Sequence, residues 1–154
     1  MEDTNHYRRP GWFTRNVGNR LVMDMTRLGM SVKGSRVLET RGRKSGLPRR
    51  TPVNLLELDE QQYLVAPRGE TEWVRNVRAD HGRLTLLLGR KRTDFVGTEL
   101  VEETVKVPLL REYLKRWKAE VGIFFDGVGP DSSDEEIAAI SERHPVFQLA
   151  HRQQ

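Results

Sequence analysis

The chain has 154 residues, of which 36% are hydrophobic and 31% are charged, a balance typical of a soluble globular protein that can bury a core. It contains no cysteine, which excludes disulfides, thiolate metal ligands and cysteine nucleophiles. The four histidines are scattered and never stand at the spacing of a helical metal site: His6, His81, His144 and His151. We therefore expect one domain over residues 1–154, without a metal.

The net charge of +4 conceals an asymmetry along the chain. Residues 1–50 carry 12 Lys or Arg against 4 Asp or Glu, whereas the remaining residues carry 14 against 18. The basic first third favours an anionic ligand, and the alternative is an ordinary solvated basic face. Neither a signal peptide nor a membrane-spanning segment is predicted, so we expect a cytoplasmic protein.

The first third of the chain begins with a polar segment, 1–10, which is expected to fray. Between residues 12 and 28, apolar residues recur every three or four positions, which predicts an amphipathic helix that closes over a sheet. The alternative is a basic amphipathic helix that rests on anionic lipid headgroups, giving a peripheral membrane contact through residues 12–28.

Short strands are predicted next, at 36–40, 51–58, 63–66, 85–88, 93–101 and 146–149, with hairpin turns at 59–62 and 89–91. Helices are predicted at 73–80 and from 105 to about 121. A third helix is predicted to begin at a capping box, with Ser133 as the N-cap and Glu136 at N3, and to end at about residue 143. Because strands and helices do not alternate strictly, the pattern predicts an α+β fold, a mostly antiparallel barrel of about six strands with flanking short helices.

The most informative stretch joins the first two predicted strands. It holds two glycines, a serine hydroxyl, a proline and several cations, in the order Gly42-Arg43-Lys44-Ser45-Gly46-Leu47-Pro48-Arg49-Arg50. Backbone N–H groups freed by glycine, beside Arg and Lys donors, favour a phosphate or a carboxylate. A P-loop is excluded, because Arg43 stands where the motif requires a glycine before the lysine and because a strand follows instead of a helix.

Other chemistry finds little support in the residues. No nucleophile elbow is present and no carboxylate is tied to a histidine, so a hydrolase is not predicted and no catalytic side chain is identified. Basic residues with Trp12, Phe13, Trp73 and Trp117 suggest nucleic-acid binding, but these aromatic residues fall on helical stripes that core packing explains. What remains is a basic turn with few proton-transfer groups, which suits a cofactor that carries the chemistry itself.

Three motifs extend this turn into a family resemblance. The run Leu38-x-Thr40-x-Gly42-Arg43-Lys44-Ser45-Gly46-x-Pro48-Arg49-x-x-Pro52 resembles the deazaflavin-dependent nitroreductase and quinone-reductase family, within the flavin-binding split β-barrels. Val65-Ala66-Pro67-Arg68-Gly69, Trp73-x-x-Asn76 and His144-Pro145-Val146-Phe147-x-Leu149 support it, and the similarity covers nearly the whole chain from about residue 10. The resemblance implies a split β-barrel, monomeric or homodimeric, that binds reduced coenzyme F420 and transfers a hydride to a small acceptor such as a quinone or nitro compound.

The resemblance also implies which residues form the site. The phosphate and oligoglutamate tail of F420 are expected at the basic turn, and the ring beside the 63–66 strand and the helix that follows: Arg43, Lys44, Ser45, Gly46, Arg49, Pro52, Val65, Ala66, Arg68, Trp73 and Asn76. Phe124 and Phe125 are expected on the acceptor side, where the tyrosine cluster of nitro-drug-reducing members is not evident, and this favours an apolar quinone-like acceptor. FMN is the alternative cofactor, and a non-enzymatic binder of the cofactor or of nucleic acid is the alternative function.

Overall fold

A computed structural model describes residues 34–153 of the chain. The predicted frayed segment at 1–10 and the predicted amphipathic helix at 12–28, with its suggested membrane contact, lie outside the described residues. Within residues 34–153, no helix is long and apolar enough to cross a membrane.

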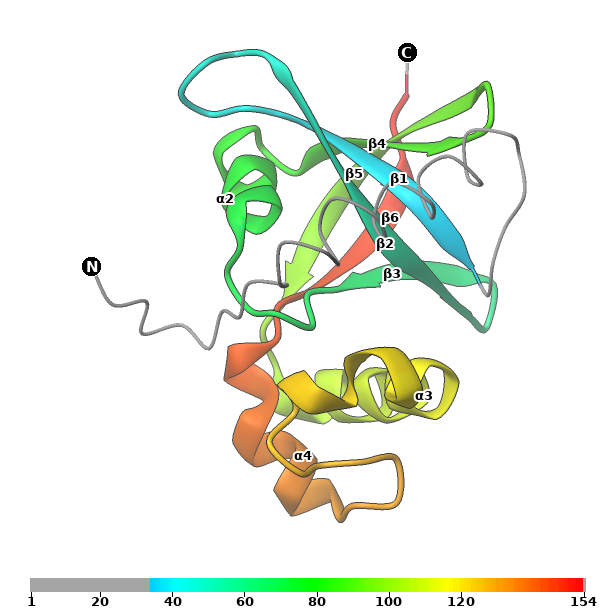
Figure 1. Cartoon of the computed structure of the whole chain (residues 1–154), viewed down its shortest axis with the longest axis vertical. Coiled ribbons are helices and arrows are strands. Elements are labelled where there is room, and N and C mark those ends of the chain that lie inside the picture. Colours follow the sequence, from blue (N-terminus) through cyan, green and yellow to red (C-terminus); the bar gives the residue numbers. More distant parts are fainter. Residues whose placement is uncertain (1–33, 154) are drawn as a thin grey trace.

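Six antiparallel strands form a closed barrel (Figure 1), which confirms the predicted fold class. The strands follow one another around the barrel in the order β1-β2-β3-β6-β5-β4. Their bounds are β1 Ser35–Arg41, β2 Pro48–Leu58, β3 Gln61–Val65, β4 Arg83–Leu88, β5 Lys91–Leu100 and β6 Val146–His151. Three hairpin connections, β1–β2, β2–β3 and β4–β5, account for half of the six pairings, because the short turns between these strands favour antiparallel neighbours.

The hairpins agree with the turn signals of the sequence. Asp59 and Glu60 join β2 to β3 with φ of 53° and 63°, the left-handed conformation that a two-residue hairpin turn requires. The strand β2 begins at Pro48, three residues before the predicted start, because the β1–β2 ladder continues out to the Arg41↔Pro48 pair. The extra length projects the basic turn beyond the barrel, as Figure 1 shows.

Helices surround the barrel on two sides. The short helix α2 (Glu72–Ala79) lies against the β1–β2 hairpin, whereas α3 (Glu103–Val121) and α4 (Asp134–Ile140) form a layer at the other end of the barrel (Figure 1). The predicted capping box at Ser133 and Glu136 is present in full. The α-helix ends at Ile140, and the remaining predicted residues form a 3-10 turn, Ser141–Arg143; a second 3-10 turn, Gly122–Phe124, follows α3.

The apolar core has two parts, because successive side chains of a strand point to opposite faces. Leu55 and Leu64 point into the barrel, whereas their neighbours Leu56 and Val65 point outward and are covered by the α3 layer. All four are buried. The consecutive leucines Leu55 and Leu56 of β2 thus contribute to both parts of the core.

Candidate functional site

The turn between β1 and β2 is closed by its own backbone. The Gly42 N–H donates to the Leu47 carbonyl and the Gly46 N–H donates to the Gly42 carbonyl, both at 2.8 Å, while Ser45 Oγ accepts from the Leu47 N–H at 3.1 Å. Gly46 has φ +75°, and a Cβ at Gly42 would lie 2.8 Å from Ser45 Oγ, so the turn requires both glycines. These bonds and the two glycines therefore define the backbone conformation of the predicted turn.

A buried asparagine attaches this turn to α2. Asn76 Oδ1 accepts hydrogen bonds from the backbone N–H of Arg43 at 3.2 Å and from Arg43 Nη1 at 2.9 Å. Asn76 Nδ2 donates to Thr40 Oγ1 at 3.3 Å. Asn76 is only 3% exposed, so these bonds replace the hydrogen bonds to water that its buried amide group cannot make. Asn76 thus fixes the distance between the turn and the helix.

The guanidinium of Arg43 is held by α2 as well. Arg43 Nη1 donates to Glu72 Oε1 at 2.8 Å, and this hydrogen bond is the main reason why the pKa of Glu72 lies below its usual value. The family resemblance implied that Arg43 holds the cofactor tail. In the structure this side chain reaches from the β1–β2 hairpin to α2, where Glu72 and Asn76 engage it, and two cavities lie beside this helix.

The first cavity lies at the N-terminal end of α2 and has a volume of about 420 Å³. We call it the Trp73 cavity. Its walls come from β1, β2, the loop after β3 and the first turns of α2: Thr40, Arg49, Arg50, Thr51, Pro52, Pro67, Arg68, Thr71, Glu72, Trp73 and Asn76. An indole, two prolines, hydroxyls and guanidiniums in one cavity suit a flat ring that carries anionic groups.

Polar groups of the Trp73 cavity differ in how fully they are engaged. Arg50 donates to Glu39 at 2.9 Å, whereas Arg49 makes neither a hydrogen bond nor an ion pair with any residue in the described part of the chain. Thr71 is the N-cap of α2, but its side chain makes no capping bond, and its buried Oγ1 lacks a partner among residues 34–153. An unused cation and an unused hydroxyl therefore line one cavity.

Aromatic packing fixes the remaining walls. The Trp73 ring lies 5.8 Å from the Phe147 ring between centroids, which anchors it to β6. The Arg68 guanidinium lies 5.9 Å from the centre of the Phe124 ring, within the range of a cation–π contact. Phe124 thus touches the loop that borders the cavity without forming part of its lining.

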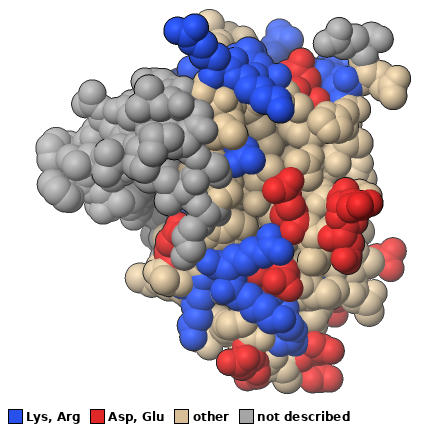
Figure 2. All heavy atoms as spheres, turned by 90° about the vertical axis from the view of Figure 1, so that its right-hand side faces the viewer, with Lys and Arg blue, Asp and Glu red and all other residues tan. Residues whose placement is uncertain are grey.

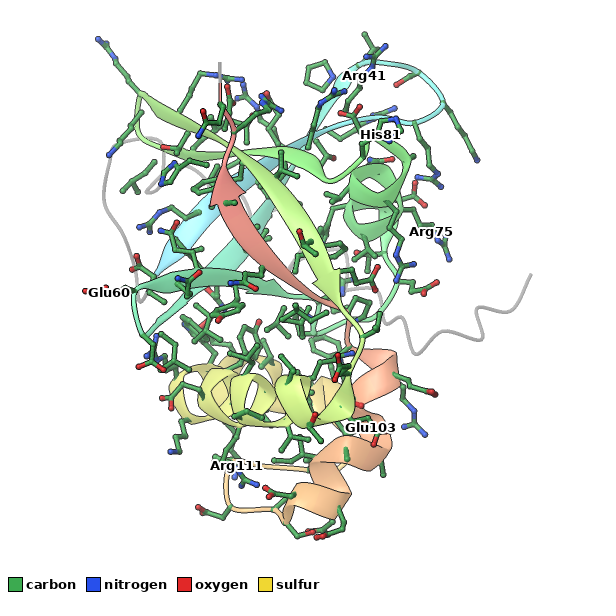
Figure 3. The ribbon with its side chains drawn as sticks, turned by 180° about the vertical axis from the view of Figure 1, so that it is seen from behind. Arg41, Glu60, Arg75, His81, Glu103 and Arg111 are labelled. Carbon is green, nitrogen blue, oxygen red and sulfur yellow. The ribbon has the colours of Figure 1, made fainter. Side chains whose placement is uncertain are left out.

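The second cavity lies at the C-terminal end of α2 and has a volume of about 530 Å³. We call it the Arg41 cavity. It is lined by the turn, by the end of α2 and by the start of β4: Arg41, Gly42, Arg43, Lys44, Ser45, Gly46, Asn76, Ala79, Asp80, His81 and Arg83. A smaller hollow of about 210 Å³ shares Arg41, Gly46, Asp80 and Arg83 with it. Figure 3 shows Arg41 and His81 at this end of the barrel, opposite Glu103 and Arg111 in the helical layer.

The structure thus distributes the sequence-predicted residues over three places. Arg49, Pro52, Arg68, Trp73 and Asn76 line the Trp73 cavity. Arg43, Lys44, Ser45 and Gly46 line the Arg41 cavity, and Asn76 lines both cavities. Val65 and Ala66 are buried at the end of β3, where the Ala66 N–H donates to the Pro145 carbonyl at 2.8 Å.

Phe125 occupies the core. Its ring has no exposed surface and stacks on the His144 ring at a centroid distance of 4.0 Å. It also packs near Tyr113 of α3, at 6.4 Å. A side chain enclosed in this way does not reach an acceptor in the Trp73 cavity, so the structure gives Phe125 a packing role, while Phe124 alone of the pair lies beside the loop of Arg68.

Several lining residues were not predicted from the sequence. Thr71 could have been found as the N-cap before the predicted helix, and Thr40 belongs to the family motif, but neither had a role assigned. His81 and Arg83 carried no signal, and Arg41 stands in the basic stretch without an assigned role. Strand pairing and the turn after α2 bring the three together. Among the described residues, no three His, Asp or Glu side chains gather where they could hold a metal ion.

The fold is thus a closed antiparallel barrel, with a cationic, glycine-bounded turn and a cavity containing Trp73 beside α2. A family model described as F420H(2)-dependent quinone reductase matches residues 8–119, more than half of the chain. The chain therefore belongs to the F420H(2)-dependent quinone reductase family. It is an oxidoreductase, and its cofactor is coenzyme F420.

Solved structures show the same fold at low identity. An F420-H2-dependent reductase, FDR-A, is 20% identical with a TM-score of 0.51, over 76% of this chain and 94% of that one. A putative pyridoxamine 5'-phosphate oxidase from Listeria innocua is 14% identical with a TM-score of 0.52, over 78% and 85%. A protein solved as a domain-swapped dimer is 20% identical with a TM-score of 0.54, over 90% and 97%. No curated protein matches the chain.

The lining residues fit this cofactor on chemical grounds. Coenzyme F420 carries a flat ring, a phosphodiester and several carboxylates, and such anions need cations and N–H or O–H donors. The guanidinium of Arg49 and the buried hydroxyl of Thr71 are unused by residues 34–153, and Trp73 and Pro52 offer apolar surface beside them. These residues would hold the ring and its nearest anionic group.

Proposed function

We propose that this chain transfers a hydride from F420H2, bound in the Trp73 cavity, to a quinone. When bound, the reduced deazaflavin supplies a hydride and a proton, and a quinone that takes up both becomes a hydroquinone. The protein's own residues bind and orient the two molecules: Arg49 and Thr71 hold an anionic group, and Trp73 supplies a wall for a flat ring. No side chain is assigned to the proton.

The observation that carries the proposal is the pairing of an unengaged cation with an unengaged hydroxyl beside an indole. Arg49 and the buried Oγ1 of Thr71 line the same 420 Å³ cavity as Trp73. A buried hydroxyl without a partner is costly, by about 1–3 kcal/mol, unless a ligand supplies the hydrogen bond. Membership of a quinone reductase family supports the quinone as the acceptor.

Titration of the purified protein with F420, followed by the cofactor's fluorescence, tests the proposal. We expect saturable binding of F420, no comparable binding of FMN, and oxidation of F420H2 by a quinone above the background rate. Binding of FMN without binding of F420 would favour the alternative cofactor. Saturable F420 binding without turnover of quinone or nitro acceptors would favour a cofactor store over an enzyme.

Nucleic-acid binding remains the alternative from another class. On the face that Figure 2 shows, basic side chains gather at the two ends and acidic side chains lie between and beside them, which is unlike an unbroken track for a polyanion. A retardation assay at moderate salt, compared with F420 binding under the same conditions, separates the two functions.

Assembly and location stay predictions. The domain-swapped dimer among the similar structures is 20% identical and supports the fold only, so monomer and homodimer remain the two predicted states. Gel filtration with light scattering at several protein concentrations separates them. The predicted cytoplasmic location and the membrane contact at 12–28 are tested by fractionation and by sedimentation with anionic liposomes.

A further inference from the structure

A further cavity opens at the end of the barrel where β1, β3 and β5 begin, with a volume of about 280 Å³. We call it the Phe95 cavity. It shares no described residue with the Trp73 cavity or with the Arg41 cavity. Figure 1 shows α2 and the β4–β5 turn, which borders this end, on opposite sides of the barrel. The Phe95 cavity is therefore separate from the place where the cofactor is proposed to bind.

The floor of the Phe95 cavity is apolar. It is formed by Leu55, Leu86 and Phe95, which belong to the core inside the barrel and are 5%, 4% and 3% exposed. The Phe95 ring lies 4.9 Å from the ring of His151 between centroids, with the two planes at 34°. Aromatic rings favour tilted or offset contacts with further rings. The floor thus offers apolar and aromatic surface to a flat ligand.

The rim of the cavity is polar and basic. Positions that point into a barrel recur at every second residue of a strand. At this end of the strands those positions change from apolar to polar residues: Arg36 on β1, Gln62 on β3, Lys91 and Thr93 on β5, and His151 on β6. No acidic side chain is among the described residues that line the cavity. Glu57 accepts a hydrogen bond from Gln62 Nε2 at 3.2 Å but lies outside this lining.

Two cations of the rim can face an anion. The Lys91 side chain is exposed and makes neither a hydrogen bond nor an ion pair with any residue of 34–153. Arg36 is half-buried and donates from Nη1 to the Ser35 carbonyl at 2.9 Å. Guanidinium and ammonium groups form their strongest hydrogen bonds with carboxylates and phosphates, and a mouth lined by one sign of charge attracts counter-ions. An apolar floor below a basic rim suits a ligand with a hydrophobic body and one anionic group.

We propose that the Phe95 cavity is a second ligand site, which binds a small aromatic carboxylate with its ring on the floor and its carboxylate at Lys91 and Arg36. Its volume is near the lower end of the range of about 300–1,000 Å³ that is typical of small-molecule sites, so it suits a ligand of one or two rings. The ring pair of Phe95 and His151 favours an aromatic body over an aliphatic one. This inference goes beyond the proposed function and does not rest on it.

Isothermal titration calorimetry of the full chain with naphthoate tests the proposal. Naphthamide has the same rings without the charge, and acetate has the charge without the rings. We expect saturable binding of naphthoate, at least about tenfold tighter than that of naphthamide, the factor that one charged hydrogen bond supplies. Acetate should not bind over the same range of concentrations. Saturating F420 should leave the Kd for naphthoate unchanged, because the cavities share no described residue.

A charge reversal tests the rim. Lys91→Glu should weaken the binding of naphthoate at least about fivefold, because it replaces an attraction by a repulsion, and should leave naphthamide unaffected. Arg90→Glu is the matched control: it reverses the charge of the neighbouring exposed residue, which lies outside the lining, and should change the Kd by less than about twofold.

A second variant tests the floor. Thr93→Phe places a ring in the cavity and should abolish the binding of both naphthoate and naphthamide. Thr98→Phe, at an exposed position of the same strand outside the lining, is its control and should bind both compounds as the wild type does. Thermal unfolding verifies that each variant folds. Lys91→Glu alters an exposed residue, so it still decides the question if Thr93→Phe does not fold.

The inference is overturned if the wild type shows no saturable binding of naphthoate, or binds naphthoate and naphthamide equally well. Displacement of naphthoate by F420, undiminished binding in a folded Thr93→Phe variant, or undiminished binding in Lys91→Glu would also overturn it, because the ligand would then lie elsewhere. Binding of F420 is measured separately in the wild type. A failure of this inference is therefore distinguishable from a failure of the proposed function.

Discussion

Asn76 Oδ1 accepts hydrogen bonds from two atoms of Arg43, the backbone N–H at 3.2 Å and Nη1 at 2.9 Å, although 33 residues separate the two in the chain. This relationship sets the position of the cationic turn relative to α2. It also gives Asn76, which the family resemblance assigned to the cofactor, a task inside the protein. The amide of Asn76 positions Arg43 and Thr40, because its oxygen and nitrogen are already hydrogen-bonded to these two residues.

We predict that Asn76→Ala destabilises the protein by about 1–3 kcal/mol, since it leaves the Arg43 N–H and the Thr40 hydroxyl without their buried partner. Urea unfolding measures this loss, and the Kd for F420 should rise in parallel. Gln148→Ala is the control: it removes an exposed side-chain hydrogen bond to Gln61, and its effect should stay within about 0.5 kcal/mol. Equal stability of the two variants would contradict the bracing role of Asn76.

Arg49→Ala is expected to weaken F420 binding by about 1.5–3 kcal/mol, the range for a hydrogen bond to a charged group. The free energy of unfolding should not change, because Arg49 has no partner among the described residues to lose. Lys44→Ala should weaken binding over the same range if the tail passes the turn. Lys91→Ala, at an exposed position of the β4–β5 turn, serves as the control. An unchanged Kd removes the substituted residue from the site.

The acid stability of the barrel should depend on Glu39. Hydrogen bonds from Arg92 and Arg50, at 2.8 and 2.9 Å, hold the pKa of Glu39 below its ordinary value of 4.5, against the opposing effect of burial. A carboxyl with a lowered pKa in the folded state stabilises that state above pH 4.5, and the stabilisation disappears as the pH falls through the folded pKa.

Glu39→Gln should therefore cost about 1 kcal/mol at neutral pH, the upper range for a partly exposed ion pair. The difference from the wild type should vanish below the folded pKa of Glu39. Unfolding in urea at a series of decreasing pH values measures both limits. A difference that persists in strong acid would mean that packing, and not the charge of Glu39, is responsible.

Alkaline stability should depend on Tyr113. Burial raises the pKa of this phenol well above its usual value of 10, although a hydrogen bond with Asn54 acts in the opposite direction. An acid whose pKa is raised in the folded state keeps its proton there, so stability falls as the pH rises above 10, where the unfolded phenol ionises. Tyrosinate absorbance should show Tyr113 ionising only as the fold melts, and Tyr113→Phe should remove that step.

Phe125 was predicted to lie on the acceptor side, and two substitutions can distinguish this role from a role in core packing. Phe125→Ala should cost about 3–5 kcal/mol, because it opens a cavity beside His144 and Tyr113 in the core. Phe125→Leu keeps most of the volume and should leave the KM for quinone unchanged in a protein that still folds. A raised KM in the leucine variant would restore the predicted role at the acceptor.

The features that could be predicted from the sequence are those determined by residues close together in the chain. Alternating apolar residues located the strands, and the Ser133–Glu136 capping box marked where α4 begins, because both signals act within a few residues. The composition of the β1–β2 turn likewise indicated an anion site, since glycine geometry and charge are local properties.

The rest depended on pairs that are far apart in the chain. Arg43 is the cation of the turn that is engaged within the protein, by Asn76 and Glu72. No sequence pattern near Arg43 indicates these two partners. Arg41 and Arg83 share a cavity only because β1 pairs with β4 around the barrel. Phe125 was expected on the acceptor side, and its contacts with Tyr113 of α3 and with His144, both distant in the chain, show that its ring lies in the core.

The strand order has a consequence for how this protein is made. β6 lies between β3 and β5, pairing Val146 with Val65 on one side and with Leu100 on the other, yet it is synthesised after both. Until Val146–His151 leave the ribosome, β3 and β5 keep open edges that can pair with other chains. We therefore expect nascent or truncated chains that lack β6 to aggregate and to depend on chaperones, even if the complete barrel is stable.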